Sequence, residues 1–117
     1  MNAYLHIPFC TSICSYCDFT SFAGQENKIS RYVDALCVEI SSSDLKGPLQ
    51  TVYFGGGTPS LLPPEKLKAI LETLQQKAGF TPDIEISMEA NPETVDEQRL
   101  RSYHALGVNR LSFGAQA

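Results

Sequence analysis

The sequence predicts an α/β fold in which short strands alternate with helices around a parallel sheet. Two observations support this prediction. Four short runs rich in apolar or β-branched residues alternate with three segments whose apolar residues recur at helical spacing, and Gly or Pro separates most of them. Strands that alternate with helices in this way form parallel sheets with right-handed crossovers. Three βα units and the start of a fourth strand would make a partial (β/α) barrel, roughly half of the usual 250 residues.

The first unit combines a short strand, a long connection and a helix. Residues 3–7 are apolar-rich and predict a strand, whereas residues 8–27 show no regular period and predict a long functional loop. From residue 28 to about residue 45, apolar side chains recur every three or four positions, which is the spacing of one helix face. Gly47-Pro48 predicts the end of this helix.

The second unit begins with a β-rich run. Residues 51–54 predict a strand that the three glycines at 55–57 stop abruptly. A helix is expected to follow the proline pair at 63–64, because proline fits the first helical turn, and to stop at Gly79. Four apolar side chains share one face of this helix: Leu67, Ile70, Leu71 and Leu74.

The third unit and a fourth strand complete the chain. Residues 84–88 predict a strand, which Asn91-Pro92 breaks. Residues 94–97, T-V-D-E, have the spacing of a capping box, so a helix is expected to open there and to close near Gly107. Residues 110–113 predict the fourth strand.

Composition narrows the classes of function. Lys and Arg total 9 and Asp and Glu total 13, a formal net charge of -4, which argues against binding to nucleic acid through its phosphates. No apolar run approaches the roughly 18 residues that span a bilayer, so no membrane span is expected. The N-terminus carries no secretory signal, which predicts a reducing, cytoplasmic location where disulfides are rare.

Three of the four cysteines lie together in the expected loop. Cys10, Cys14 and Cys17 have C-x3-C-x2-C spacing within eight residues. Thiolates bind soft metals and iron–sulfur clusters, and a short loop can wrap three of them around one corner of a cubane. Three ligands on a four-iron cluster would leave one iron open for chemistry.

The alternative for this cysteine cluster is a structural zinc site. Such a site requires four ligands, so it would recruit His6 or His104, neither of which has a useful local spacing. Cys37 lies on the apolar face of the first expected helix and is interpreted as a small buried hydrophobe. His104 is expected to face solvent or to have a local partner.

The first strand and the cysteine loop resemble one known family. Residues 5–10, L-H-I-P-F-C, followed by the two further cysteines, resemble the radical S-adenosylmethionine (SAM) superfamily. The resemblance implies that the three cysteines hold a [4Fe-4S] cluster, whose open iron chelates the methionine moiety of SAM. Cleavage of SAM by the reduced cluster then yields a 5′-deoxyadenosyl radical. The resemblance also implies that Tyr16 packs beside the adenine and that Tyr4 contacts SAM.

Later blocks carry the same resemblance. The glycine run would be a plain turn about as often as a ligand loop, and no Gly-Lys-Ser/Thr phosphate-binding pattern follows it. Glu89 falls at the carboxyl end of the third expected strand, the edge where barrel enzymes place their sites, although an isolated glutamate there is more often a solvated acid. By resemblance, five residues of these blocks are SAM contacts: Gly56, Gly57, Thr58, Glu89 and Gln116.

The motifs at residues 17–19, C-D-F, and 54–60, F-G-G-G-T-P-S, resemble one branch of this superfamily. That branch contains HemW-type heme chaperones and oxygen-independent coproporphyrinogen III dehydrogenases. Phe19 stands where the dehydrogenases carry a further cysteine, which favours a chaperone that delivers heme to respiratory enzymes. The alternatives are radical decarboxylation of coproporphyrinogen III in porphyrin biosynthesis and a zinc-binding interaction module, which would not need the glycine and glutamate blocks.

This resemblance makes residues 1–117 the N-terminal half of a radical SAM core domain, with the cluster loop at about residues 8–27 and no second domain. The heme-binding residues of the full-length protein would lie in the other half, so no heme ligand and no catalytic residue is assigned. A half barrel leaves an open sheet edge. We therefore expect the 117 residues alone to bind SAM poorly and to turn over no substrate.

Overall fold

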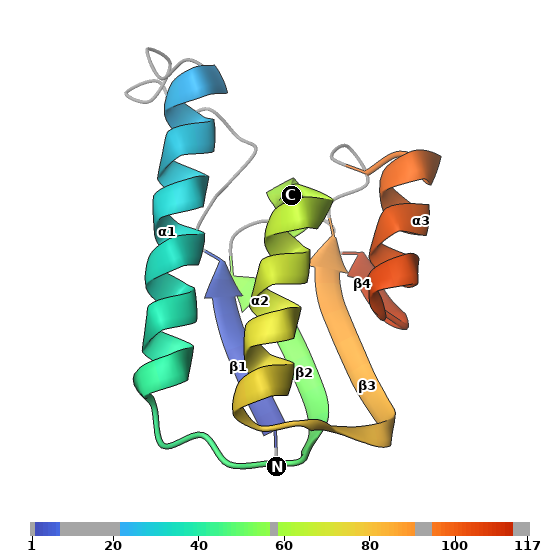
Figure 1. Cartoon of the computed structure of the whole chain (residues 1–117). Helices are drawn as coiled ribbons and strands as arrows, with labels where there is room; N and C mark the ends of the chain where they lie inside the picture. Colours follow the sequence, from blue (N-terminus) through green and yellow to red (C-terminus); the bar gives the residue numbers. More distant parts are fainter. Residues whose placement is uncertain (1, 8–21, 57–58, 91–94, 114–117) are drawn as a thin grey trace.

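The computed structural model describes residues 2–7, 22–56, 59–90 and 95–113, which form one parallel sheet with helices on one side (Figure 1). The strands lie in the order β1-β2-β3-β4, and every neighbouring pair is parallel. This confirms the predicted α/β architecture. The elements are β1 (Asn2–Ile7), α1 (Phe22–Ser42), β2 (Leu49–Gly56), a 3-10 turn (Pro59–Leu61), α2 (Pro64–Lys77), β3 (Phe80–Ala90), α3 (Glu97–Leu106) and β4 (Arg110–Phe113).

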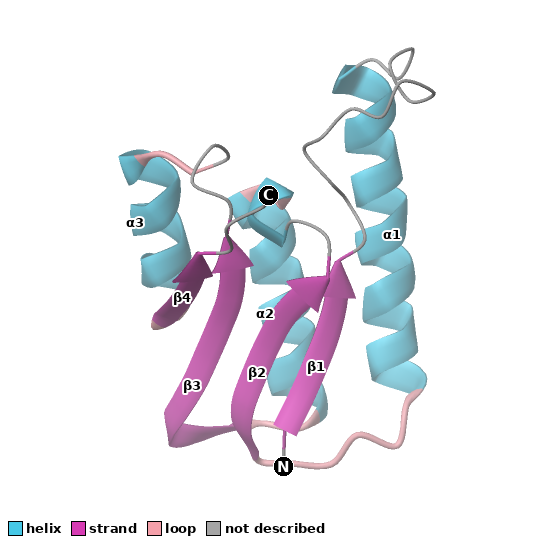
Figure 2. Ribbon diagram, turned by 180° about the vertical axis from the view of Figure 1, so that it is seen from behind, coloured by secondary structure: helices cyan, strands magenta, loops and turns pink. Residues whose placement is uncertain are grey.

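The two faces of the sheet differ in what covers them. All three helices stand on one face, and the view from behind shows the strands with no described helix over them (Figure 2). Because side chains alternate along a strand, each strand sends every second residue under the helices. One cross-strand row of this covered face, Leu5, Phe54 and Met88, is at most 4% exposed.

Helix α1 begins earlier than the sequence predicts. It starts at Phe22, so the expected loop of residues 8–27 is wrong at its end, and the helix closes at Ser42 rather than near Leu45. The first turns of α1 rise past the carboxyl edge of the sheet (Figure 1). Turns with no sheet beneath them need no apolar stripe, so hydrophobic periodicity did not detect them.

Strands β2 and β3 are longer than the sequence predicts. Strand β2 runs through Gly55 and Gly56, which pair with His6 and Ile7 of β1, so the glycines do not stop it abruptly. Ladder pairing uses backbone groups, so a residue without a side chain can still take part once a neighbouring strand lies alongside. Strand β3 likewise extends beyond both ends of the predicted run at residues 84–88.

Helices α2 and α3 show which terminal signals were correct. The four apolar residues of the predicted α2 face are all buried. The capping box at residues 94–97 was the wrong start for α3: the N-cap is Asp96, whose carboxylate accepts the Arg99 amide at 2.7 Å, and Thr94 lies outside the described residues. Aspartate is a strong N-cap residue, and two overlapping cap patterns competed here. Gly107 ends α3 at φ 115°, as predicted.

Candidate site at the carboxyl edge of the sheet

Polar and aromatic side chains meet on the uncovered face, above Gly55 of β2. A methyl group placed on Gly55 would lie 2.7 Å from the Tyr4 hydroxyl oxygen, 2.8 Å from Tyr53 Cε1 and 2.9 Å from Glu89 Oε1. These side chains come from β1, β2 and β3 respectively, so three strands contribute to one spot. Any larger residue at position 55 would displace them. We call Tyr4, Tyr53, Gly55 and Glu89 the Gly55 cluster.

The two tyrosines of this cluster are stacked. Their ring centroids lie 5.7 Å apart with an interplanar angle of 17°. Tyr4 is 60% exposed, whereas Tyr53 is half-buried. Burial raises the pKa of Tyr53, and the hydrogen bond and the negative charge of Glu89 raise it further. The Tyr53 hydroxyl therefore keeps its proton at neutral pH and can donate it to the carboxylate.

The glutamate also holds the backbone of the glycine run. The Gly56 amide donates to Glu89 Oε1 at 3.0 Å. Gly56 has φ 109°, a conformation that other residues adopt only with strain, and a methyl group there would meet the His6 ring at 2.7 Å and the Ile7 carbonyl oxygen at 2.9 Å. The structure thus brings two sequence-predicted site residues, Gly56 and Glu89, into direct contact.

His6 lies near the end of β1, two residues before the expected cysteine loop, and is exposed. Its Nδ1 lies 3.5 Å from the Tyr4 hydroxyl, and its backbone carbonyl accepts a hydrogen bond from the Tyr32 hydroxyl of α1. Tyr32 therefore ties α1 to the end of β1, immediately before the cysteine segment. Burial and the nearby Glu39 charge raise the pKa of Tyr32.

Two residues of α3 hold the segment that follows the glycine run. The buried Tyr103 hydroxyl donates to the carbonyl oxygens of Ser60 at 3.0 Å and Leu62 at 2.6 Å, and Arg99 Nη1 donates to the same Ser60 carbonyl at 2.9 Å. Burial raises the pKa of Tyr103 to about 12, against the smaller opposing effect of Arg99. The sequence analysis did not identify this anchor. Its only signal was a hydroxyl-bearing aromatic facing the core from α3.

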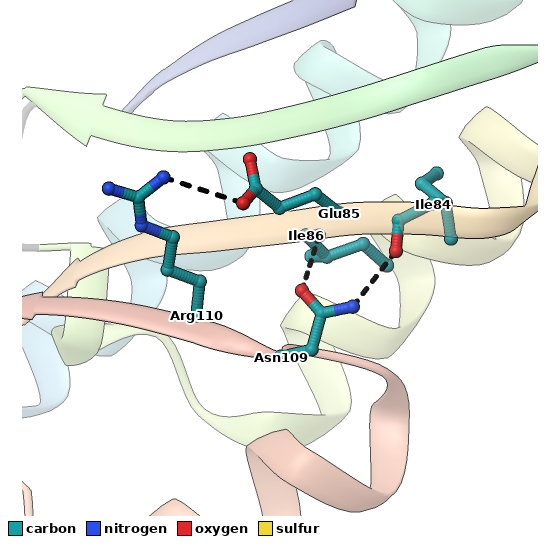
Figure 3. Close-up of polar contacts among 5 residues, drawn as sticks. All are labelled: Ile84, Glu85, Ile86, Asn109 and Arg110. Carbon is teal, nitrogen blue, oxygen red and sulfur yellow. Dashed lines mark hydrogen bonds and ion pairs between the residues drawn. The ribbon is translucent and has the colours of Figure 1, made fainter.

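The side chain of Asn109 makes two hydrogen bonds that align β4 with β3 (Figure 3). Asn109 Oδ1 accepts the Ile86 amide at 2.9 Å, and Asn109 Nδ2 donates to the Ile84 carbonyl at 2.8 Å. The side chain thereby continues the hydrogen-bonding pattern of the sheet one step before β4 begins. Arg110 follows, with Nη1 3.4 Å from Glu85 Oε1 on the uncovered face.

The structure brings only some of the sequence-predicted residues together. Tyr4, Gly56 and Glu89 converge, and His104 is exposed on α3, as expected. Cys37 is half-buried rather than fully buried, because it sits at the margin of the α1–α2 contact, with Sγ 3.9 Å from the Ala69 carbonyl oxygen. The predicted residues outside the described part of the chain are Cys10, Cys14, Tyr16, Cys17, Gly57, Thr58 and Gln116.

Within the described ranges, no three His, Cys, Asp or Glu side chains gather into a metal-binding group. None of the helices described is both long and apolar enough to cross a membrane. The candidate site is the polar edge of the sheet around the Gly55 cluster, and the segment with the three cysteines follows β1 in the sequence.

Sequence comparison identifies the family of the chain that carries this polar edge. The model of the radical SAM superfamily matches residues 4–117. The chain belongs to the radical SAM superfamily. Proteins of this superfamily use a [4Fe-4S] cluster and SAM. This radical SAM chain carries three cysteines of suitable spacing for the cluster and, at Gly55 and Gly56, backbone without side chains that could block a ligand.

Named relatives lie in the HemW and HemN branch. The heme chaperone HemW of Synechocystis sp. is 49% identical over 98% of this radical SAM chain, which covers 30% of that relative. Anaerobilin synthase of Escherichia coli O157:H7 is 40% identical over 97% of the chain, which covers 27% of that relative. The chain thus spans less than a third of the length of these relatives.

A solved structure agrees with the sequence comparison. Coproporphyrinogen III oxidase (HemN) from Escherichia coli, described as a radical SAM enzyme, superposes with a TM-score of 0.83 at 34% identity. The match covers 98% of this chain and 27% of the HemN chain. The parallel sheet described above is therefore part of a radical SAM barrel fold.

Proposed function

We propose that this chain is the N-terminal half of the radical SAM core of a HemW-like heme chaperone, comprising residues 1–117. The observation that carries the proposal is the 49% identity to a HemW protein over nearly the whole chain. Phe19, in the place of a further cysteine, agrees with it. In this proposal the protein works in the cytoplasm, binds heme through residues outside this chain, and passes it to respiratory enzymes.

The three cysteines would hold the [4Fe-4S] cluster. Cys10, Cys14 and Cys17 supply thiolates, the ligand type that such clusters use. The chemistry that a reduced cluster supplies is one-electron cleavage of SAM, for which an electron-donor protein is needed. The chain's own contribution is to bind and orient SAM.

The Gly55 cluster would form the protein side of the SAM site. Glu89 has acceptor capacity beyond the Gly56 amide, because an ionised carboxylate offers about four lone-pair positions. These positions suit ribose hydroxyls or an ammonium group. Tyr4 of this cluster would contact SAM, and four further contacts complete the proposed site: Tyr16, Gly57, Thr58 and Gln116.

A second candidate is oxygen-independent coproporphyrinogen III dehydrogenase. The observation that favours it is the 0.83 TM-score to the HemN structure. The two functions differ in the porphyrin ligand and in whether a reaction follows. The third candidate is a zinc-binding interaction module, in which zinc would take the place of the iron–sulfur cluster.

The cluster is tested in the full-length protein by anaerobic reconstitution with iron and sulfide. Electron paramagnetic resonance of the reduced protein is then recorded with and without SAM. A [4Fe-4S] signal that changes on addition of SAM is expected. Cys10→Ser should abolish the signal, whereas Cys37→Ser, a matched change at a half-buried cysteine outside the loop, should preserve it. Stoichiometric zinc that blocks reconstitution would support the third candidate instead.

The porphyrin ligand is tested with the full-length protein. Heme titration followed by the Soret band should show saturable binding, and incubation with coproporphyrinogen III, SAM and a reductant should give no protoporphyrinogen. Release of carbon dioxide and formation of protoporphyrinogen would instead establish the dehydrogenase.

A further inference from the structure

We propose that Tyr53 is a positioning residue that holds the Glu89 carboxylate toward the Gly56 amide and the open side of the sheet, where the carboxylate receives hydroxyl or ammonium donors of SAM. The inference rests on the proposed function, because it assumes that SAM binds at this edge. It adds a residue outside the set of contacts inferred by resemblance.

The register of the sheet places Tyr53 beside Glu89. Tyr53 pairs with Tyr4 on β1 and with Ser87 on β3, and Glu89 lies two residues beyond Ser87 on the same face. Tyr53 is therefore the diagonal cross-strand neighbour of Glu89, a separation that an aromatic side chain can bridge. Tyr53 Cε1 and Glu89 Oε1 both lie within 2.9 Å of one point above Gly55, so the two side chains share the same small space.

The tyrosine is itself held in place. The Tyr4 ring stacks on it from β1, and Gly55 leaves the space beneath the pair open. A ring restrained on its face presents its hydroxyl in one direction, so it can orient a neighbouring carboxylate. Tyr4 is less suited to this task because it is 60% exposed and its hydroxyl has a second neighbour, His6 Nδ1, at 3.5 Å.

The carboxylate then has two fixed contacts and free capacity. The Gly56 amide occupies one position on Oε1, and the Tyr53 ring lies beside the carboxylate above Gly55, where its hydroxyl can donate to a second position. Two donors from β2 would fix the plane of the group, which belongs to β3, before any ligand arrives. A preorganised acceptor loses less entropy on binding than a mobile one.

The first test uses the full-length protein and SAM affinity. Tyr53→Phe removes the hydroxyl and retains the ring, and should weaken SAM binding about tenfold, the effect of one hydrogen bond to a charged group. In a Glu89→Gln background the same change should have almost no further effect, because the group it orients has been altered. Thr73→Val, a matched loss of a hydroxyl that contacts the Ala69 carbonyl on α2, should leave the affinity unchanged.

The second test needs no ligand or cluster. In apoprotein labelled with ¹³C at the tyrosine ζ carbon, the Tyr53 resonance should titrate with a pKa raised above the ordinary range. Glu89→Gln should lower that pKa by removing a negative neighbour, and Arg110→Gln should raise it by removing a positive one. A folding defect common to both variants would not move the pKa in opposite directions.

The outcomes separate this inference from the proposed function. If Tyr53→Phe binds SAM as tightly as the wild type, or if the losses of affinity in the double variant are additive, Tyr53 has no positioning role. The proposed SAM site would still stand. Failure of the wild type to bind SAM would overturn both. A tenfold loss that disappears in the Glu89→Gln background, together with opposite pKa changes, would establish the positioning role.

Discussion

The two faces of this sheet are built from alternate residues of the same strands, yet they serve different ends. On β2, Phe54 points under the helices and is 0% exposed, while its neighbour Tyr53 points to the uncovered face and lies beside Glu89 above Gly55. On β3, Met88 and Glu89 divide in the same way. The covered face holds hydrocarbon against hydrocarbon, and the uncovered face holds donors and acceptors that can receive a ligand.

This division teaches where substitutions should act. Burial of apolar surface stabilises the fold, so changes on the covered face should lower the free energy of unfolding. Half-exposed polar side chains contribute much less to that free energy. Changes on the uncovered face should therefore alter ligand binding at nearly constant stability.

The largest expected effect comes from the covered face. Phe54→Ala should lower the free energy of unfolding by about 3–5 kcal/mol, because it leaves a cavity in a row that includes Leu5 and Met88. Tyr4→Ala, on the uncovered face of the next strand, should cost only about 1 kcal/mol, the worth of one aromatic pair. Urea denaturation of the full-length apoprotein measures both. Equal losses would contradict the division between the faces.

Tyr103 tests how firmly the covered side holds the segment after the glycine run. The folded protein keeps this phenol protonated to a pKa of about 12, whereas an unfolded tyrosine ionises near its ordinary pKa of 10.0. The unfolded state therefore loses its proton first. The raised pKa therefore contributes on the order of 2–3 kcal/mol to the free energy of unfolding below about pH 10. This contribution is lost as the pH rises to about 12.

Tyr103→Phe should abolish this part of the alkaline loss. At pH 8 the variant should be less stable than the wild type by about 1–2 kcal/mol, because the carbonyls of Ser60 and Leu62 lose a donor. As the pH rises past 10, the difference should narrow or reverse. Urea denaturation at both pH values measures it, and a constant difference would show that the buried phenol does not titrate with folding.

Asn109 tests whether a polar side chain can stabilise the sheet itself. Asn109→Ala should cost about 1–2 kcal/mol, because it removes a donor and an acceptor that continue the β3–β4 ladder. Asn109→Asp retains the acceptor for the Ile86 amide and loses the donor to Ile84, so it should fall between. Denaturation midpoints rank the three proteins, and amide hydrogen exchange at Ile86 should rise in the alanine variant alone.

Much of the fold could be predicted from the sequence because apolar periodicity reports the covered face directly. The α2 face and the order of strands and helices followed from it. The bounds of strands and helices were predicted wrongly where backbone pairing between strands or the choice of the N-cap residue determined them. Gly55 and Gly56 joined a strand through β1, and Asp96 displaced the expected cap at residues 94–97.

The site was harder to predict than the fold. Glu89 and Gly56 were identified only through the family motif, since nothing in their spacing required a contact between β2 and β3. Tyr53 and Tyr103 were missed because a tyrosine in a strand or helix usually serves as core. Their roles depend on register and on distant carbonyl groups, which a local pattern does not contain.

The smallest expected effect on stability concerns Arg110 and Glu85, the ion pair on the uncovered face. The atoms are 3.4 Å apart, and the side chains are 67% and 45% exposed, so water and salt screen the attraction. Arg110→Gln should therefore change the free energy of unfolding by less than about 0.5 kcal/mol, as measured in urea at low and moderate salt. By contrast, Phe54→Ala should lower the free energy of unfolding by about 3–5 kcal/mol, although it removes only uncharged atoms. A loss above about 2 kcal/mol in Arg110→Gln would mean that the uncovered face also holds the sheet together. The separation of stability from ligand chemistry would then fail at β4, one of the two edge strands of the described sheet.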